Sequence, residues 1–214
     1  MFKAYFLFKP GIDDPFRFQS DEASSHIREH FPGVVSYVQT RALPDQDAVS
    51  FSGSAELWFL DSVSAIAACQ KGIDPLLADG AEIDSVLAGM ERVVVRTPEY
   101  LSADRIKGVY PFCKKEGMTL AEFQHHWWYK HGPIAALTEE ALSYIQIHPI
   151  LDTDEMMSSN YDGITEISWP DVAAASRAIE SRQMREDQGG DAPNFVDMDS
   201  IALFLAKEEL VIAP

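Results

Sequence analysis

The chain has 214 residues, of which 46% are hydrophobic, and this is enough apolar material for one large domain or two small ones. Its formal net charge of −17 argues against nucleic acid or an anionic membrane surface as a partner, because both favour clustered lysine and arginine. The sequence has no run of eighteen apolar residues and no signal-peptide pattern, so we expect a cytoplasmic protein that does not span a membrane. Cys69 and Cys113 are expected to be reduced structural thiols.

The first half of the chain predicts the element order βαββαβ. Aromatic and β-branched runs favour strands, and Pro10-Gly11 and Pro32-Gly33 mark turns between elements. We expect strands at residues 2–9, 34–43, 54–60 and 90–97, and helices at residues 20–31 and 62–71.

The second half repeats this order. The segments IKGVYPFCK (106–114), LSYIQIHPIL (142–151) and YDGITEISWPD (161–171) correspond in sequence to FKAYFLFK (2–9), VSYVQTRAL (35–43) and FSGSAELWFLD (51–61). Three matches in the same order indicate an internal duplication. A helix at 172–185, a loop at 187–199 and a strand at 200–206 complete the second copy, and residues 98–105 form the expected linker. The chain is therefore predicted to consist of an N-terminal repeat at 1–98 and a C-terminal repeat at 105–214.

A helix is indicated at residues 119–133, TLAEFQHHWWYKHGP. Thr119 and Glu122 form a capping-box pattern at its start, and Gly132-Pro133 is expected to end it. One face of this helix carries residues that recur every four positions, namely Phe123, Trp127 and His131. We interpret this face as a packing surface for the outer side of the sheet, which leaves His131 as a candidate functional group at its end.

A βαββαβ unit is the ferredoxin-like plan, an α+β fold in which an antiparallel sheet has both helices on one face. The other face of each sheet is apolar and must be covered. We therefore predict that the two sheets pack into one intramolecular, pseudo-dimeric α/β barrel.

Strand parity assigns side chains to the two faces of each sheet. In the second strands the aliphatic or β-branched positions are expected to meet the helices, namely Val38, Thr40, Ile145 and Ile147. The alternate positions are expected to point into the barrel: Tyr37, Gln39, Arg41, Tyr144, Gln146 and His148. In the third strands the inward positions are expected to be Glu56, Trp58, Glu166 and Ser168.

Glu56 and Glu166 thus occupy equivalent inward positions, and a buried carboxylate needs either a partner or a function. In the functional interpretation, a carboxylate whose pKa is raised by burial acts as an acid or base. The best candidate catalytic group is then His148 beside Tyr144 and Glu166. As a structural alternative, Glu56 pairs with Arg41, and Glu166 pairs with His148 or Tyr144. Both interpretations stay open at this point.

No metal site is expected. His26 and His30 have a helical ligand spacing but no third ligand nearby, and His125 and His126 are interpreted as exposed. The aspartate-rich loop at 187–199 lacks the alternating oxygen ligands of a calcium loop, so we interpret it as a solvated connection.

These patterns resemble the EthD-like members of the dimeric α/β-barrel superfamily. The resemblance spans residues 105–212 and is carried by Phe123-x-x-x-Trp127-x-x-x-His131-x-Pro133, Tyr144-x-Gln146, Tyr161-Asp162-Gly163 with Glu166, and Asn194-Phe195-Val196-Asp197. The first half of the chain has no Trp-x-x-x-His element and resembles a degenerate copy of the second half. One working site rather than two is therefore expected.

The resemblance implies a small-molecule enzyme, in a family whose members share a fold and differ in activity. The leading hypothesis is cofactor-independent proton transfer, as in a dehydratase, decarboxylase or cyclase, on a small apolar, aromatic or cyclic metabolite inside the barrel. His148 would act as the general base or acid, Tyr144 or Glu166 would orient it, and His131 would lie at the barrel rim. The expected substrate-binding residues are Tyr37, Arg41, Glu56, Trp58, Tyr110, Gln146 and Phe195.

Two alternatives belong to other classes. One is an oxidoreductase-related role, as a haem-binding oxygenase or an accessory to one, and the other is a non-catalytic small-molecule binding protein. A homodimer of pseudo-dimers stays open as the assembly.

Overall fold

The computed structural model describes residues 1–44, 46, 50–96, 105–152 and 159–213. The predicted element order of the first half is confirmed, with a short 3₁₀ helix, η1 (Asp74–Leu76), before the last strand. The other elements are β1 (Phe2–Phe8), α1 (Ser20–His30), β2 (Ser36–Ala42), β3 (Gly53–Phe59), α2 (Ser62–Lys71) and β4 (Ile83–Val95).

The second half has the same order with a more broken helical layer. Its strands are β5 (Ile106–Phe112), β6 (Ser143–Pro149), β7 (Gly163–Trp169) and β8 (Phe204–Ile212). Its helices are α3 (Leu120–His126), the π-helical η2 (Trp127–His131), α4 (Gly132–Ala135), α5 (Val172–Glu180), the π-helical η3 (Gln183–Gln188), α6 (Gly189–Asp191), and the 3₁₀ helices η4 (Ala192–Asn194) and η5 (Met198–Ser200). The predicted linker at residues 98–105 lies outside the described residues except for its last member.

The eight strands form a closed barrel in the order β1-β3-β2-β8-β5-β7-β6-β4. Within the first half the order is β4-β1-β3-β2, and the pairs β1–β3, β1–β4 and β2–β3 are all antiparallel. The second half has the equivalent order β8-β5-β7-β6. This confirms the predicted fold class, in which two ferredoxin-like repeats build one pseudo-dimeric α/β barrel.

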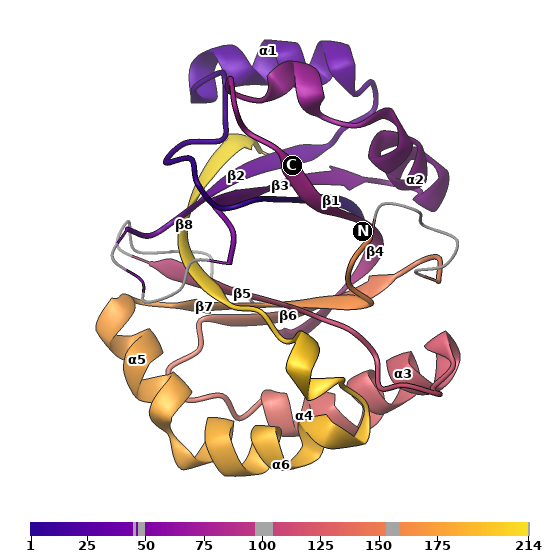
Figure 1. The fold of residues 1–214 in the computed structure, drawn as a ribbon, viewed down its shortest axis with the longest axis vertical. Coiled ribbons are helices and arrows are strands. Elements are labelled where there is room, and N and C mark those ends of the chain that lie inside the picture. Colours follow the sequence, from indigo (N-terminus) through magenta and orange to yellow (C-terminus); the bar gives the residue numbers. More distant parts are fainter. Residues whose placement is uncertain (45, 47–49, 97–104, 153–158, 214) are drawn as a thin grey trace. The chain divides into compact units, whose positions relative to one another are not determined.

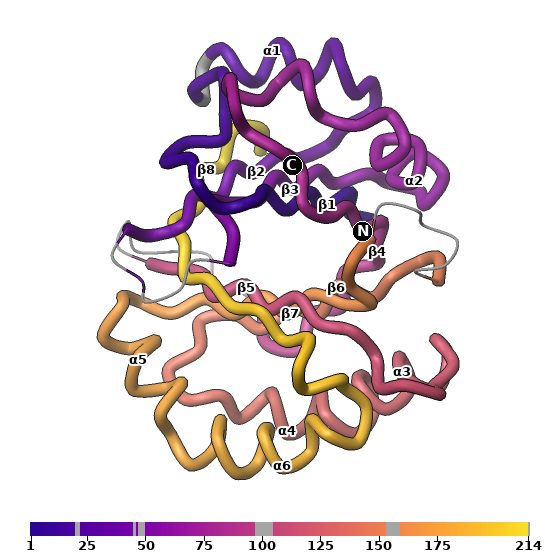
Figure 2. Tube along the Cα trace, viewed as in Figure 1, coloured from indigo at the N-terminus to yellow at the C-terminus, as the bar shows by residue number. Residues whose placement is uncertain are grey.

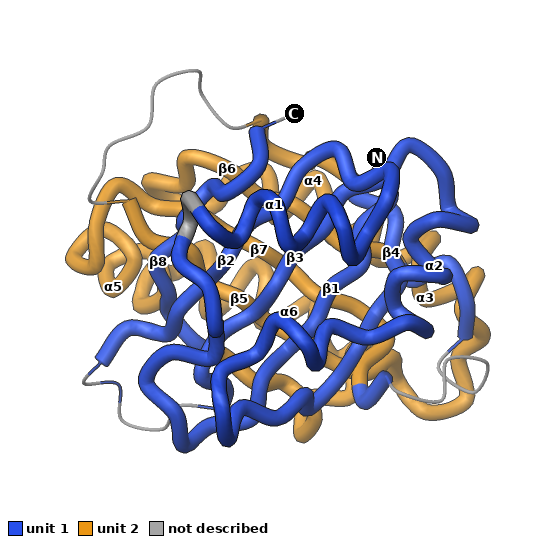
Figure 3. Tube along the Cα trace, turned by 90° about the horizontal axis from the view of Figure 1, so that it is seen from above, with its two compact units in different colours: residues 1–91, 149–160, 204–214 blue, residues 92–148, 161–203 orange. Residues whose placement is uncertain are grey.

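The chain divides into two compact units, coloured separately in Figure 3. Unit 1 contains residues 1–91, 149–160 and 204–214, and unit 2 contains residues 92–148 and 161–203. The last strand, β8, belongs to unit 1 because it pairs with β2, and Figure 2 shows the two segments side by side. These units do not coincide with the repeats at 1–98 and 105–214, so the division by repeat stays a prediction.

The fourth strand of each half has different bounds from those expected. β4 begins at Ile83 rather than at residue 90, because its antiparallel pairing with β1 extends as far as Phe8. β8 runs to Ile212 rather than ending at residue 206, because its pairing with β2 extends as far as Tyr37. Pairing partners that are remote in sequence therefore set these bounds.

In unit 1, α1 and α2 cover one face of the β1–β3–β2 sheet (Figure 1). The alternate residues Ala4, Phe6 and Phe8 of β1 are fully buried and share a core with Ile27 of α1 and Ala65 of α2. Burying one side chain of the size of Phe contributes about 1.5–3 kcal/mol to stability. No helix within the described residues is long and apolar enough to cross a bilayer.

The capping box predicted at Thr119 is confirmed, but the helix that follows it does not end where expected. The Thr119 side chain accepts a hydrogen bond from the Glu122 backbone, and the Glu122 carboxylate accepts one from the Thr119 backbone. The chain then widens into a π-helical turn, in which the Gly132 N–H donates to the Trp127 carbonyl, and continues as α4. Pro133 is tolerated because it lies in the first turn of α4, where its missing N–H is not needed.

The side chains of the third strands lie on the sheet faces that were predicted. The side chains of the second strands lie on the opposite faces from those predicted. Ile145 lies directly across from Glu166, whereas Tyr144 lies across from Ile167, and paired residues share a face. The side chains predicted to point into the barrel lie on the helix-covered face instead, namely Tyr37, Gln39, Arg41, Tyr144, Gln146 and His148. The prediction failed because both faces are buried, so hydrophobicity could not distinguish between them.

Candidate functional site

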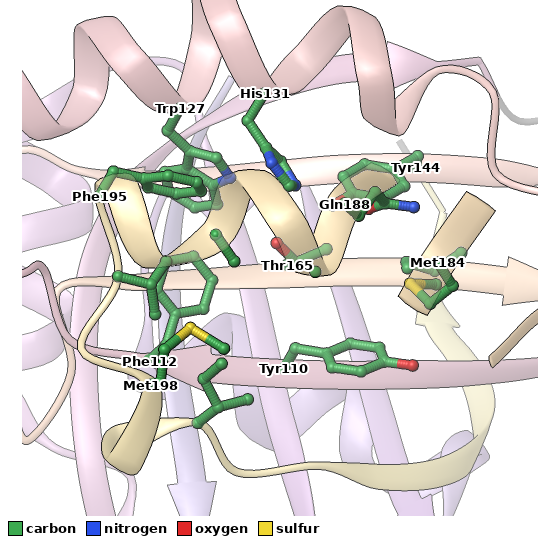
Figure 4. Close-up of a pocket in the computed structure, with 15 residues that line it drawn as sticks. Tyr110, Phe112, Trp127, His131, Tyr144, Thr165, Met184, Gln188, Phe195 and Met198 are labelled. Atoms are coloured by element: carbon green, nitrogen blue, oxygen red, sulfur yellow. Dashed lines mark hydrogen bonds between the residues drawn. The ribbon is translucent and has the colours of Figure 1, made fainter. Parts of the chain in front are cut away.

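Unit 2 contains a cavity of about 210 Å³ between its sheet and its helical layer. The sheet contributes alternate residues of three strands: Tyr110 and Phe112 from β5, Tyr144 from β6, and Thr165 and Ile167 from β7. The helix after Thr119 contributes Trp127 and His131, which lie above the strands in Figure 4. The cavity therefore lies on the helix-covered face of the sheet, whereas the sequence predicted a ligand site inside the barrel.

The remaining wall is built by the aspartate-rich stretch that was interpreted as a solvated connection. This interpretation is wrong, because the stretch folds into short helices and places apolar side chains against the cavity. The lining residues from this stretch and from the residues just before and after it are Met184, Gln188, Gly189, Ala192, Phe195, Val196, Met198 and Ile201. Phe195 was the only lining residue of this stretch that was predicted from the sequence to bind substrate.

His131 forms the titratable group of the cavity. Its side chain is 7% exposed, and its Nδ1 lies 3.0 Å from Oδ2 of Asp191. Because a carboxylate only accepts hydrogen bonds, Nδ1 carries the proton and Nε2 is the nitrogen left with a lone pair. Burial lowers the pKa of His131 below its ordinary value, although the hydrogen bond and the charge of Asp191 act in the opposite direction.

Asp191 is itself fixed by three side chains. Nε2 of His126 lies 3.0 and 3.2 Å from its two carboxylate oxygens, and Nδ2 of Asn194 donates to Oδ1 at 3.2 Å. Burial alone would raise the pKa of the Asp191 carboxyl, but the hydrogen bonds from His126, Asn194 and His131 lower it below its ordinary value. The carboxylate is thus held ionised, and it orients the imidazole of His131. His126, which was expected to be exposed, is half-buried here and stacks on Phe195.

Tyr144 and Gln188 form a hydrogen-bonded group beside His131, and a side-chain hydrogen bond with Gln188 opposes the lowering of the His131 pKa by burial. The Tyr144 hydroxyl donates to Oε1 of Gln188 at 3.3 Å. Nε2 of Gln188 donates to Thr138 and to Gln183, both at 2.9 Å. The amide is thus held by fixed partners, and burial raises the pKa of Tyr144 so that its phenol stays protonated.

Tyr110 differs from Tyr144 in the hydrogen bonding of its hydroxyl group. The Tyr110 oxygen is buried and has no hydrogen-bond partner among the described residues. Burial raises the pKa of this phenol, and nearby Tyr144 raises it further. The Tyr110 hydroxyl is therefore a buried polar group of the cavity wall whose hydrogen-bonding capacity is unused by the described part of the chain.

His148 does not line this cavity, in contrast to its predicted central role. Its ring stacks on Trp127, with ring centroids 4.3 Å apart, and its Nε2 lies 2.8 Å from Oε1 of Gln146. Nε2 of Gln146 in turn donates to the Trp127 carbonyl at 3.1 Å. Burial, followed by the charge of Arg92, lowers the pKa of His148 to about 3, so the ring is neutral at physiological pH. His148 and Gln146 hold Trp127 in place.

Glu166 and Glu56 are also outside the cavity, and their predicted partners are wrong. Glu166 lies 2.9 Å from the ammonium group of Lys107, and Glu56 lies 2.8 Å from that of Lys3. Thr40 donates a further hydrogen bond to Glu56 at 3.1 Å. The two pairs occupy equivalent positions in the two repeats, which the lysines in FKAY and IKGV could have indicated.

The predicted binding residues of the first half lie in unit 1, apart from this cavity. Arg41 pairs with Asp14 at 3.1 Å and with Glu209 at 2.9 Å, and not with Glu56. Trp58 donates to Glu91 at 2.7 Å, and Tyr37 belongs to the core. Of the eleven predicted site residues, the cavity brings together Tyr110, Tyr144, His131 and Phe195, and it adds Asp191 and Gln188, which sequence reasoning missed.

The EthD domain family matches residues 115–199 of the chain. A search of curated proteins found no match. Among solved structures, an anthrone oxidase-like protein superposes with a TM-score of 0.58 at 10% identity, covering 98% of this chain and 93% of its own. A chlorite dismutase from Candidatus Nitrospira defluvii in complex with imidazole has a TM-score of 0.54 at 9% identity, with coverages of 96% and 90%. A candidate monooxygenase from Lactobacillus acidophilus NCFM has a TM-score of 0.52 at 11% identity, with coverages of 98% and 94%. At these identities the structural likeness establishes the fold over nearly the whole chain.

Proposed function

Residues 115–199 of this chain form an EthD domain, and we propose that the protein is a small-molecule enzyme whose reaction is a proton transfer in the cavity of unit 2. The substrate is a small, largely apolar, cyclic metabolite. His131 is the general base or acid, and Asp191 is its positioning residue. The reaction class is that of a cofactor-independent lyase or cyclase, such as a dehydratase.

The observation that carries this proposal is the 3.0 Å hydrogen bond from Nδ1 of His131 to Asp191 at the wall of an apolar cavity. It fixes the tautomer in which Nε2 has the lone pair, as a proton acceptor requires. In the first step, Nε2 takes a proton from a carbon next to a carbonyl group. The C–H bond breaks, an N–H bond forms, and the electron pair moves toward the carbonyl oxygen to give an enolate beside the imidazolium of His131. Loss of a leaving group or ring closure then follows from that enolate.

A haem group fits this cavity poorly. The cavity of about 210 Å³ is smaller than the roughly 300–1,000 Å³ typical of pockets for drug-sized ligands, and a haem macrocycle is larger than such ligands. The haem-binding form of the oxidoreductase alternative therefore gains no support from the size of this cavity, and we favour the proton-transfer function.

The test is hydrogen exchange at carbon. The purified protein is incubated in D₂O with a panel of one- and two-ring ketones, and deuterium incorporation is followed by mass spectrometry. We expect the wild-type protein to accelerate exchange and His131→Gln to lower the rate by about 10²–10⁴-fold, the usual contribution of a general base.

His125→Gln is the matched control, because His125 is exposed and contacts Tyr129 rather than the cavity. It should exchange at the wild-type rate. Equal rates for wild type and His131→Gln would contradict the assignment of His131. If the wild-type protein accelerates exchange of no ketone in the panel, the proposed reaction class is wrong.

A further inference from the structure

The unused hydroxyl group of Tyr110 identifies the kind of ligand that the cavity selects. We propose that Tyr110 is the specificity-determining residue of the site, and that the ligand is an uncharged one- or two-ring molecule with a neutral oxygen acceptor, such as a ketone carbonyl, placed against this hydroxyl. This inference rests on the proposed function and deepens it, because it names the chemical class of the substrate.

The first argument is the hydrogen-bond inventory of the two cavity tyrosines. The Tyr144 hydroxyl donates to Gln188, whereas the Tyr110 hydroxyl is buried without a partner among the described residues. A buried polar group without a hydrogen-bond partner is energetically unfavourable. A ligand oxygen that accepts a hydrogen bond from Tyr110 removes that cost, and a ligand without such an oxygen does not.

The second argument is charge. No lysine or arginine lines the cavity within the described residues, and His131 is engaged by Asp191. A carboxylate or phosphate group would therefore lose its hydration on entering the cavity and would find no counter-ion there, which is strongly unfavourable. Because burial keeps the Tyr110 phenol protonated, the group offers a neutral donor, and a neutral acceptor is its complement.

The third argument is size and shape. A cavity of about 150 Å³ lined by apolar side chains can hold benzene, so about 210 Å³ suits one ring or two fused rings. Phe112 and Trp127 meet edge to face, with centroids 5.0 Å apart, and Phe195 completes an aromatic wall. In Figure 4, Tyr110 lies on the strand side and His131 on the helix side. A ring between them can be held at its oxygen by one wall and approached by the base from the other.

The experiment compares binding of three matched probes by calorimetry: 2-tetralone, tetralin, which lacks the oxygen, and the corresponding tetralin-2-carboxylate. We expect the wild-type protein to bind the ketone at least about tenfold more tightly than tetralin, and to bind the carboxylate more weakly than the ketone. Tyr110→Phe should lower affinity for the ketone about tenfold and leave affinity for tetralin unchanged. Tyr129→Phe is the control, since Tyr129 is 62% exposed and should keep the full preference.

The outcomes separate this proposal from the proposed function. His131→Gln should keep the ketone preference while it loses deuterium exchange, so binding selectivity can succeed even if the catalytic assignment fails. The proposal on Tyr110 is overturned if the wild-type protein binds tetralin or the carboxylate as tightly as the ketone, or if Tyr110→Phe retains the preference. Failure of the wild-type protein to bind any of the three probes also overturns it.

Discussion

The ammonium group of Lys107 lies 2.9 Å from the carboxylate of Glu166, and the two side chains are only 5% and 2% exposed. The equivalent pair in the first repeat, Lys3 and Glu56, is 2.8 Å apart and fully buried. The glutamates that appeared to be catalytic candidates are therefore partners in a duplicated ion pair. Their positions in the middle of each sheet suit a structural role.

Removal of one partner should destabilise the protein strongly. Lys107→Met removes the ammonium group that lies 2.9 Å from the buried Glu166 carboxylate, and we expect a loss of about 3–5 kcal/mol in the free energy of unfolding. Urea denaturation followed by circular dichroism measures it. Lys9→Met is the matched control, because the Lys9–Glu82 pair has a similar length of 2.8 Å but is 52% and 67% exposed. That variant should be as stable as wild type, and equal losses for both lysines would contradict the structural role.

Asp191→Asn should lower catalysis without removing the base. An asparagine side chain can offer its NH₂ group to Nδ1 of His131 and so favour the tautomer whose Nε2 carries the proton. We expect deuterium exchange to slow by at least about 10²-fold, while ketone binding changes little. Asp187→Asn controls for charge, since Asp187 pairs with the exposed Arg182 at 2.9 Å. Nitrogen-15 NMR of the His131 ring should show the tautomer change, and an unchanged tautomer with unchanged exchange would refute this role of Asp191.

Gly163 allows the sheet to approach Trp127 closely. A Cβ at this position would lie 2.7 Å and 2.9 Å from two atoms of the Trp127 ring, which are too short for real contacts. Gly163→Ala should therefore cost about 1–3 kcal/mol through overpacking and shift the tryptophan fluorescence. Gly190→Ala is the control, because a Cβ there would meet nothing within 4 Å. Similar stability of the two alanine variants would show that Trp127 moves away without cost.

The stability of the protein should depend on pH through His148. Its pKa is about 3 in the folded state, and the ordinary value is about 6.5, so the unfolded chain binds the proton first as the pH falls. The contribution of His148 is fully present above about pH 6.5 and is lost progressively down to about pH 3, by at most about 1.4 kcal/mol per unit. Urea midpoints across this window should fall more steeply for wild type than for His148→Gln. Parallel pH dependences would mean that His148 is not buried as a neutral ring.

Some features of the site could be read from the sequence. The every-fourth-residue pattern placed Phe123, Trp127 and His131 on one buried face, and all three are at most 5% exposed. Tyr110 and Phe195 were also expected to line a pocket. What failed was the choice of sheet face for the second strands, because His148 and its neighbours are buried on either assignment. Asp191 was missed because its partner His131 lies 60 residues away in an unrelated local pattern.

The sequence by itself determined the duplicated βαββαβ order and the barrel, because strand and helix periodicity and the internal repeat are local properties that survive in the linear pattern. Only the tertiary structure decided where the cavity lies and which residues converge on it. Its walls come from three strands, a helix with a π-turn and a short-helix segment near residues 183–201, and their contacts depend on packing rather than on spacing along the chain. The Asp191–His131 pair and the unpartnered Tyr110 hydroxyl are consequences of that packing.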